Sequence, residues 1–218
     1  MKTVLSTREL SSGQRDLLLG AGIGLVHYNA IHTHAMEFEL PSEDNCFIFT
    51  SGRAVEYFFE AGDDKMKDLE CFCVGDQTAS KLTEKGQKVI EIAQNGQELG
   101  EIIAKTYKNR QFVYVCGKQR LDTLPHLLQS HHINFTELAV YQTERTFKTF
   151  DRSFDAVLLF SPSAVESYCE ANDPKDAWLV CIGDTTARSA YNYSEKVAVA
   201  NSTRIESVIA KAVNTLKL

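Results

Sequence analysis

Apolar and polar positions along the chain predict strands that alternate with helices throughout. Short apolar runs of strand length are each followed by a stretch in which apolar residues recur every three or four positions. We expect strands over Lys2–Ser6, Leu25–Ile31, Asn45–Thr50, Glu70–Val74, Lys88–Ile92, Phe112–Cys116, Phe135–Tyr141, Ala156–Phe160, Trp178–Ile182 and Lys196–Val199. We expect helices over Arg8–Leu19, Ala54–Glu60, Thr78–Lys85, Gln97–Lys108 and Leu121–His131, and from Ala164, Thr185 and Thr203. This order predicts an α/β fold with mostly parallel sheets covered on both faces.

The chain contains two near-copies of one strand–loop–helix pattern. The first copy is Ile48–Glu56 with Val74–Ala79, and the second is Leu159–Glu166 with Ile182–Ala187. Both contain Ser-x-x-Ala-Val-Glu and Gly-Asp-x-Thr-Ala, and the serine precedes the glycine by 24 residues in one copy and 22 in the other. Any two α/β half-sheets share apolar strands and turn residues, but not such strings at matching spacing. We therefore favour duplication of a half of about 109 residues, the size of a small domain.

Two further segments alternate polar and apolar residues and carry no helix signals. They are Thr33–Leu40 and Thr143–Phe150, and they occupy similar places in the two halves. Such alternation is typical of an exposed two-stranded antiparallel ribbon. The pair is therefore expected to bridge two lobes.

The repeated loops are candidates for binding an anion. Each follows a strand and begins a helix, where backbone amides and the positive end of the helix dipole favour negative charge. A single loop of this kind is more often an ordinary capped turn, since Asp76 or Asp184 can cap the next helix. Two paired copies at strand carboxyl ends favour a ligand. Neither loop matches a P-loop, and Gly20-x-Gly22-x-Gly24 has the wrong order for a dinucleotide fingerprint.

Composition narrows the classes of function. The net charge of −6 argues against a general nucleic-acid surface, and no apolar run reaches the length of a membrane span. No signal peptide is visible, and the six cysteines lie mostly in strand-like runs, so we expect a reduced, cytoplasmic setting. Cys71-x-Cys73, His32 with His34, and His131-His132 favour structural roles over a metal, and no nucleophilic motif is evident.

Tyr141 ends the apolar strand Glu137–Thr143, just before the second alternating segment. A phenol there could donate a proton or a hydrogen bond to a leaving group. It could equally pack at the strand end with its hydroxyl in water. The residues alone favour the second interpretation.

The chain resembles the uroporphyrinogen-III synthase family. The matching residues follow the family's order over nearly the whole chain: Phe49-Thr50-Ser51 with Arg53-Ala54-Val55, Val74-Gly75-Asp76 with Thr78-Ala79, Cys116-Gly117 with Arg120, Asp122, Leu124 and Pro125, Val140-Tyr141-Gln142-Thr143, Phe160-Ser161-Pro162-Ser163, and Ile182-Gly183 with Thr185-Thr186-Ala187. The chain departs from the family at Leu121, where many members carry a basic or polar residue.

The resemblance implies two flavodoxin-like α/β lobes joined by a two-stranded antiparallel connector. One lobe would comprise residues 1–33 with 152–218, and the other residues 37–143. The connector strands would be residues 34–36 and 144–151. This division cuts across the duplicated halves.

The resemblance also implies a lyase of porphyrin and heme biosynthesis that needs no cofactor. Its substrate, hydroxymethylbilane, is a linear tetrapyrrole with many carboxylates. Loss of the hydroxyl gives an azafulvene, ring D attacks through its substituted carbon to form a spiro intermediate, and reclosure with ring D inverted yields uroporphyrinogen III in the cleft between the lobes. The protein would fold the substrate, hold its carboxylates and assist loss of water.

The resemblance carries residue roles over to matching positions. Tyr141 is the candidate for assisting hydroxyl loss, while Lys118 and Arg120 could add charge. The expected substrate-binding residues are Ser51, Arg53, Gly75, Gln77, Thr78, Ala79, Gly117, Ser161, Ser163, Ala164, Thr185 and Thr186. We expect a monomer that takes its substrate from hydroxymethylbilane synthase, without nucleic acid, membrane or metal.

Two other functions fit some of the same features. A non-enzymatic two-lobed protein that binds or senses a small anion would share the loops and the hinge. A nucleotide-dependent transferase on a Rossmann-like lobe is a second alternative, and the missing glycine fingerprint weighs against it.

Overall fold

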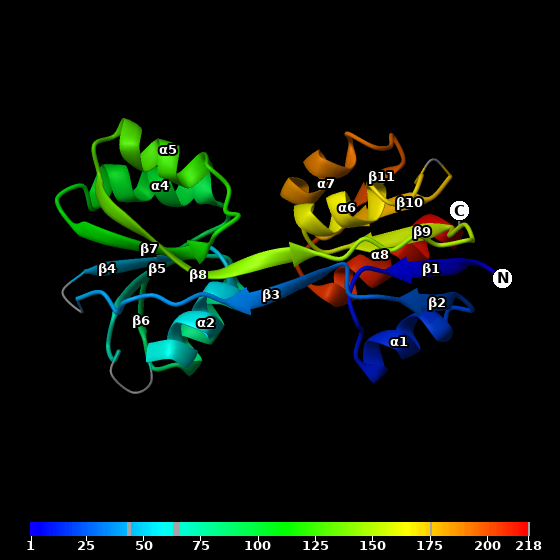
Figure 1. Cartoon of the computed structure of the whole chain (residues 1–218), viewed down its shortest axis with the longest axis horizontal. Helices are drawn as coiled ribbons and strands as arrows, with labels where there is room; N and C mark the ends of the chain where they lie inside the picture. The colour runs from blue at the N-terminus through cyan, green and yellow to red at the C-terminus, as the bar shows by residue number, and fades with distance from the viewer. Residues whose placement is uncertain (43–44, 63–65, 175, 218) are drawn as a thin grey trace. The chain divides into compact units, whose positions relative to one another are not determined.

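The protein folds into two compact units, each with its own sheet (Figure 1). The structure is a computed structural model that describes residues 1–42, 45–62, 66–174 and 176–217. Unit 1 comprises Met1–His32 and Glu144–Leu218, and unit 2 comprises Thr33–Thr143. The predicted α/β fold with two mostly parallel sheets is confirmed.

Unit 1 is a parallel five-stranded sheet between two pairs of helices. Its strands are β1 (Thr3–Ser6), β2 (Gly24–His27), β9 (Ala156–Leu159), β10 (Trp178–Cys181) and β11 (Val197–Val199), in the order β11-β10-β9-β1-β2. Its helices are α1 (Ser12–Leu19), α6 (Pro162–Cys169), α7 (Asp184–Ala190) and α8 (Ile205–Lys217). Apolar side chains of α6 and α7 pack on one face, and those of α1 and α8 pack on the other. Every residue of β9 is buried, as a central strand covered on both faces requires.

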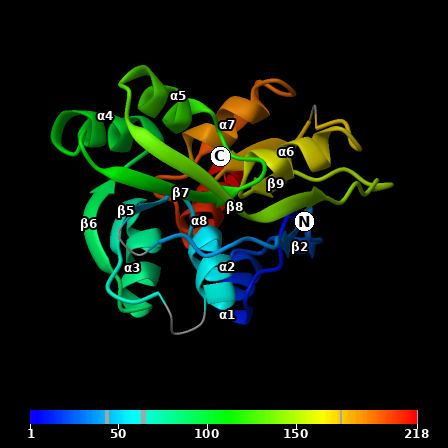
Figure 2. The same ribbon diagram turned by 60° about the vertical axis from the view of Figure 1, so that its left-hand side comes forward.

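Unit 2 has the same layered construction, as Figure 2 shows. Its strands are β3 (Ile31–Ala35), β4 (Cys46–Phe49), β5 (Glu70–Val74), β6 (Lys88–Ala93), β7 (Gln111–Gly117) and β8 (Asn134–Arg145), in the order β3-β8-β7-β4-β5-β6. Its helices are α2 (Gly52–Gly62), α3 (Asp76–Glu84), α4 (Gly96–Thr106) and α5 (Thr123–Ser130). Helices α2 and α3 bury one sheet face, which is rich in phenylalanine, and α4 and α5 bury the other.

The strand orders of the two units are related by circular permutation. Numbered along the chain, the strands of unit 1 have the flavodoxin-like order 2-1-3-4-5. The five parallel strands of unit 2 have the same order if β7 is counted as the first strand, β8 as the second, and β4, β5 and β6 as the third to fifth. Apart from β3, each half of the chain therefore gives its first two strands to one unit and its last three to the other. The predicted duplication explains this arrangement.

The strands at the passage between units differ from the predicted ones. The expected strand Leu25–Ile31 is two strands, since β2 ends at His27 and β3 begins at Ile31. Both alternating segments leave the sheet early, β3 at Ala35 and β8 at Arg145, so the connector strand predicted over residues 144–151 is wrong beyond residue 145. After residue 145 the backbone forms hydrogen bonds outside the sheet. The Thr146 amide donates to Ala30 O (2.8 Å), and the Phe150 amide donates to Asn172 Oδ1 (2.9 Å).

Candidate functional site

The carboxyl edge of the unit 2 sheet gathers most of the residues expected to bind substrate. Strands β4, β5 and β7 are parallel, so the loops that follow Phe49, Val74 and Gly117 meet at one edge. Residues expected there are Ser51, Arg53, Gly75, Gln77, Thr78, Ala79, Gly117 and Tyr141, and the structure places all of them in or next to these loops.

Ser51 and Tyr141 meet at this edge. Ser51 Oγ accepts a hydrogen bond from the Ala54 amide (3.2 Å), which caps the start of α2. The same Oγ lies 3.4 Å from the hydroxyl of Tyr141, a residue of β8. The phenol therefore stands beside the positive end of α2, where an anionic ligand is favoured.

The Gly75 loop presents its backbone and two exposed side chains, Asp76 and Gln77, at this edge. Gly75 has φ +83°, a conformation that strains any residue with a β-carbon, and it begins α3 without a side-chain cap. Thr78 and Ala79 are only 5% and 7% exposed, so their side chains pack into the unit. The Gln77 amide, unlike the Asp76 carboxylate, can donate a hydrogen bond to an anionic ligand.

The positive charge at this edge differs from the expected set. Arg53 is exposed in the first turn of α2, as a substrate-binding role requires. Arg120 instead donates to both carboxylate oxygens of Glu137 (2.9 and 2.7 Å) and pairs with Asp122, which raises the pKa of its guanidinium. Arg120 is therefore paired with two carboxylates of its own unit.

Lys81 is a cation at this edge that the sequence did not reveal. Its side chain crosses from α3 to Gly52, where an added β-carbon would lie 3.0 Å from Lys81 Cδ and 3.2 Å from Nζ. It forms an ion pair with Glu56. The absence of a side chain at Gly52 thus lets an ammonium group reach the N-terminus of α2.

The carboxyl edge of unit 1 repeats the serine geometry. Ser161 Oγ accepts from the Ala164 amide at 3.2 Å, the same bond that Ser51 makes, and caps α6. The second loop differs: Gly183 has extended backbone with φ −173°, unlike Gly75. Ala164 and Thr186 are buried, whereas Ser163 is half-buried and Thr185 exposed.

Arg8 adds a cation to this second edge. Helix α1 begins at Ser12 behind a capping box at Ser11, so Arg8 lies in the loop after β1 and not in the predicted helix. Its guanidinium carbon lies 5.6 Å from the centroid of the Phe160 ring, a cation–π contact with the residue that follows β9. The only feature of the sequence that pointed to Arg8 was a long polar side chain shortly after a predicted strand.

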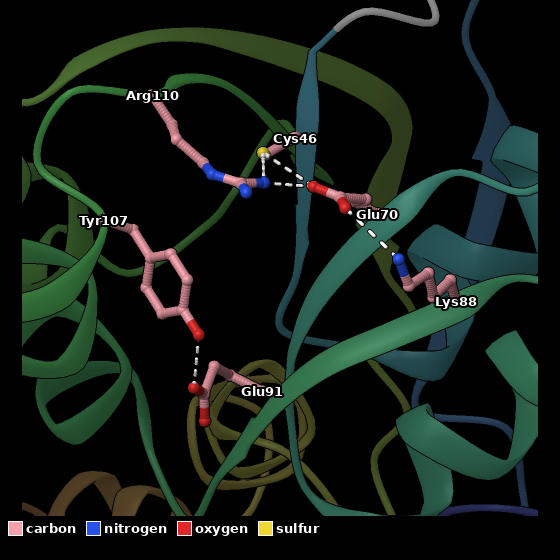
Figure 3. A network of polar contacts seen from close by, with 6 residues as sticks. All are labelled: Cys46, Glu70, Lys88, Glu91, Tyr107 and Arg110. Carbon is pink, nitrogen blue, oxygen red and sulfur yellow. Dashed lines mark hydrogen bonds and ion pairs between the residues drawn. The ribbon is translucent and has the colours of Figure 1, made fainter.

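The opposite, amino edge of unit 2 carries a polar network of a different kind (Figure 3). Glu70 pairs with Arg110 and with Lys88 (3.4 Å), and Arg110 Nη1 donates to Cys46 Sγ at 3.3 Å. The hydrogen bond from Arg110 holds the pKa of Glu70 below its usual value. Cys46 and Glu70 are the first residues of β4 and β5. The network therefore links the starts of neighbouring strands, at the end of the sheet opposite Ser51.

The described residues hold neither a metal-ligand cluster nor a membrane-spanning helix. In residues 1–42, 45–62, 66–174 and 176–217, no group of three His, Cys, Asp or Glu side chains could hold a metal ion. Over the same ranges, no helix combines the length and apolar character needed to span a membrane. All six cysteines are free and buried.

Comparison with known proteins supplies the family. The family model described as uroporphyrinogen-III synthase HemD matches residues 16–210. The chain belongs to the uroporphyrinogen-III synthase family. The uroporphyrinogen-III synthase of Chlorobaculum parvum is 25% identical over 175 residues, which cover 70% of this chain and 71% of that protein.

Two further relatives bear on this assignment. The porphyrin biosynthesis protein HemD of Ruminiclostridium josui is 27% identical over 187 residues, 75% of this chain, and the match spans only 36% of that protein. The crystal structure of uroporphyrinogen-III synthetase from Helicobacter pylori superposes with a TM-score of 0.73 at 17% identity, covering 99% of this chain and 100% of that one. The fold and the lyase-type cyclase class are thereby confirmed, and the non-enzymatic anion sensor is not favoured.

Proposed function

We propose that this chain converts hydroxymethylbilane into uroporphyrinogen III with loss of water, and that the carboxyl edges of both units bind the substrate. The observation that carries this proposal is the family match over residues 16–210. The meeting of Tyr141 with the capped start of α2 supports it, because it joins a proton donor to a site that favours carboxylates.

Binding would come from many modest contacts. The substrate offers carboxylates along its length, and the chain offers amides at the starts of α2 and α6 with Arg53, Lys81 and Arg8 nearby. Each hydrogen bond contributes about 0.5–1.5 kcal/mol net, and more when it is charge-assisted. Gln77, Gly75, Ser163 and Thr185 would add side-chain or backbone contacts, while the buried Thr78, Ala79, Ala164 and Thr186 would shape the loops from beneath.

The reaction requires the protein to position the substrate and to assist the departing hydroxyl with one proton donor. Pyrrole electrons expel the hydroxyl, and a hydrogen bond from the Tyr141 phenol would stabilise the departing oxygen. Ring D then attacks through its substituted carbon, and the spiro intermediate opens and recloses with that ring inverted. Holding the substrate so that this attack is favoured over direct closure is the main contribution of the two edges.

The setting that we propose is a cytoplasmic monomer that receives hydroxymethylbilane from hydroxymethylbilane synthase. Six free buried cysteines suit a reducing compartment. Each unit has its own sheet and core, so neither needs a second copy to bury its apolar surface. The substrate closes spontaneously to the type I isomer, which favours direct transfer between the two enzymes.

Isomer analysis tests the proposed function. Freshly generated hydroxymethylbilane is incubated with the protein, with heat-denatured protein and with buffer, and the oxidised porphyrins are separated by chromatography. Predominant type III product with the native protein supports the proposal. Type I product at the buffer rate in all three incubations would leave the chain a binder and not a cyclase.

A further inference from the structure

The hydroxyl end of the Tyr141 ring rests against a position where no side chain fits. A β-carbon at Gly117 would lie 2.6 Å from Tyr141 Cζ, 2.8 Å from Cε2 and 2.9 Å from the hydroxyl oxygen. Gly117 is buried at the end of β7, beside the strand that carries Tyr141, and the Lys118 amide donates to Tyr141 O at 2.8 Å. The backbone on both sides of this contact is therefore fixed by the sheet.

A second contact fixes the plane of the same ring. The Tyr57 ring of α2 stacks on Tyr141, with centroids 5.4 Å apart and an interplanar angle of 21°. Both tyrosines are half-buried and pack against the rim of the phenylalanine-rich core beneath α2, so the stacked pair joins that core to the carboxyl edge of the sheet.

Tyr57 is itself held at its far end. Its hydroxyl donates to the Thr33 carbonyl oxygen (2.8 Å) and lies 2.9 Å from the Thr33 hydroxyl, both on β3. Strand β3 neighbours β8, which carries Tyr141. Helix α2 and two strands thus determine together how the Tyr141 ring lies.

We propose that Tyr57 and Gly117 are positioning residues for Tyr141. Gly117 leaves room for the hydroxyl end of the ring, and Tyr57 fixes its plane, so that the hydroxyl stays beside Ser51 at the start of α2. This inference rests on the proposed function only in taking Tyr141 as the group that assists loss of the substrate hydroxyl. Displacement of such a group by about 1 Å can lower a rate by about 10²-fold.

A double-mutant cycle tests the coupling in the full-length protein. We expect Tyr57→Leu to lower kcat about 10-fold with KM within about 2-fold, whereas Tyr57→Phe, which keeps the ring but loses the Thr33 bonds, retains most activity. In a Tyr141→Phe background, Tyr57→Leu should cost less than about 2-fold more, because the group that it positions is already lost. Multiplying losses would show that Tyr57 acts independently of Tyr141 and would overturn the proposal, as would full activity of Tyr57→Leu.

A direct view of the ring separates this proposal from the proposed function. In protein with ring-labelled tyrosine, the Tyr141 signals are identified by their loss in Tyr141→Phe. We expect Tyr57→Leu and Gly117→Ala each to shift these signals or speed their ring flips, with thermal unfolding confirming a folded protein. Unchanged Tyr141 signals in both variants would overturn the positioning role whatever the activity. Failure of the wild-type protein to form type III product would instead reject the proposed function and leave the ring measurement valid.

Discussion

The side-chain oxygens of Ser51 and Tyr141 lie 3.4 Å apart at the point where α2 begins. Ser51 also caps that helix through the Ala54 amide, so one hydroxyl serves both the fold and the candidate catalytic group. Ser161 makes the same cap at α6, and no tyrosine hydroxyl among the described hydrogen bonds pairs with it. The duplication therefore supplies a matched pair of serines.

Replacing each serine by alanine should separate capping from catalysis. Both Ser51→Ala and Ser161→Ala lose a helix cap, and each should lower the free energy of unfolding by about 1 kcal/mol. Only Ser51→Ala also loses the contact with Tyr141, so we expect its kcat to fall several-fold below that of Ser161→Ala. Urea unfolding and initial rates on the same preparations check both expectations. Equal kcat values for the two variants would show that the Ser51 contact has no catalytic role.

Removing the Tyr141 hydroxyl tests the group itself. A positioned proton donor contributes about 10²–10⁴-fold, and partial compensation by water leads us to expect that Tyr141→Phe lowers kcat by at least about 10-fold. The aromatic ring remains, so KM should stay within about 2-fold. Single-turnover rates with fresh hydroxymethylbilane measure this step. An unchanged kcat would remove Tyr141 from the catalytic role.

The sequence revealed the edges of both sheets because the signals there are local. A strand, a small polar loop and a helix start are neighbours in the chain, so Ser51 and Ser161 could be identified from spacing alone. Parallel strands then place such loops at one edge. The two repeated loops are not identical in the structure, since Gly75 and Gly183 differ in backbone conformation.

The residues that sequence reasoning missed depend on contacts between distant segments. Lys81 reaches Gly52 only because α2 and α3 pack side by side, and Tyr57 meets Tyr141 only because β8 joins the sheet. Arg120 was expected to add charge for the substrate, and its pairing with Glu137 on the next strand was not foreseen. Such pairings follow from strand order, which the alternation of elements does not specify.

Lys81 should contribute to substrate binding and little to the chemical step. We expect Lys81→Met to raise KM about 3- to 10-fold with little change in kcat, because it removes a charge-assisted contact with a carboxylate. Lys88→Met is the matched control, since Lys88 pairs with Glu70 at the amino edge. Raising the ionic strength should increase KM less for Lys81→Met than for the wild type. Equal KM values for both variants would exclude Lys81 from the site.

The network around Glu70 should affect stability and leave activity unchanged. Its members are partly exposed, so Glu70→Gln should lower the free energy of unfolding by no more than about 1 kcal/mol at pH 7. Because the folded state lowers the pKa of Glu70, its contribution is present above the unfolded value near 4.3 and is lost as pH falls through the folded value. Urea unfolding of the two proteins should therefore converge at low pH. A fall in kcat for Glu70→Gln would contradict a purely structural role.

Stability should fall at alkaline pH because the thiols ionise more readily in the unfolded chain than in the folded one. Burial raises the pKa of Cys73 to about 11 and those of Cys116 and Cys181 to about 12, whereas an unfolded thiol ionises near 8.5. The unfolded chain therefore releases these protons first, and the free energy of unfolding is fully retained below about pH 8.5 and declines as pH rises toward 11–12. The slope approaches about 1.4 kcal/mol per pH unit for each group, and urea unfolding in reductant at pH 7, 9 and 10 measures it. Cys181→Ala removes one titrating group and should make the decline shallower. A slope unchanged by Cys181→Ala would show that other groups, such as the buried Tyr114, control alkaline unfolding.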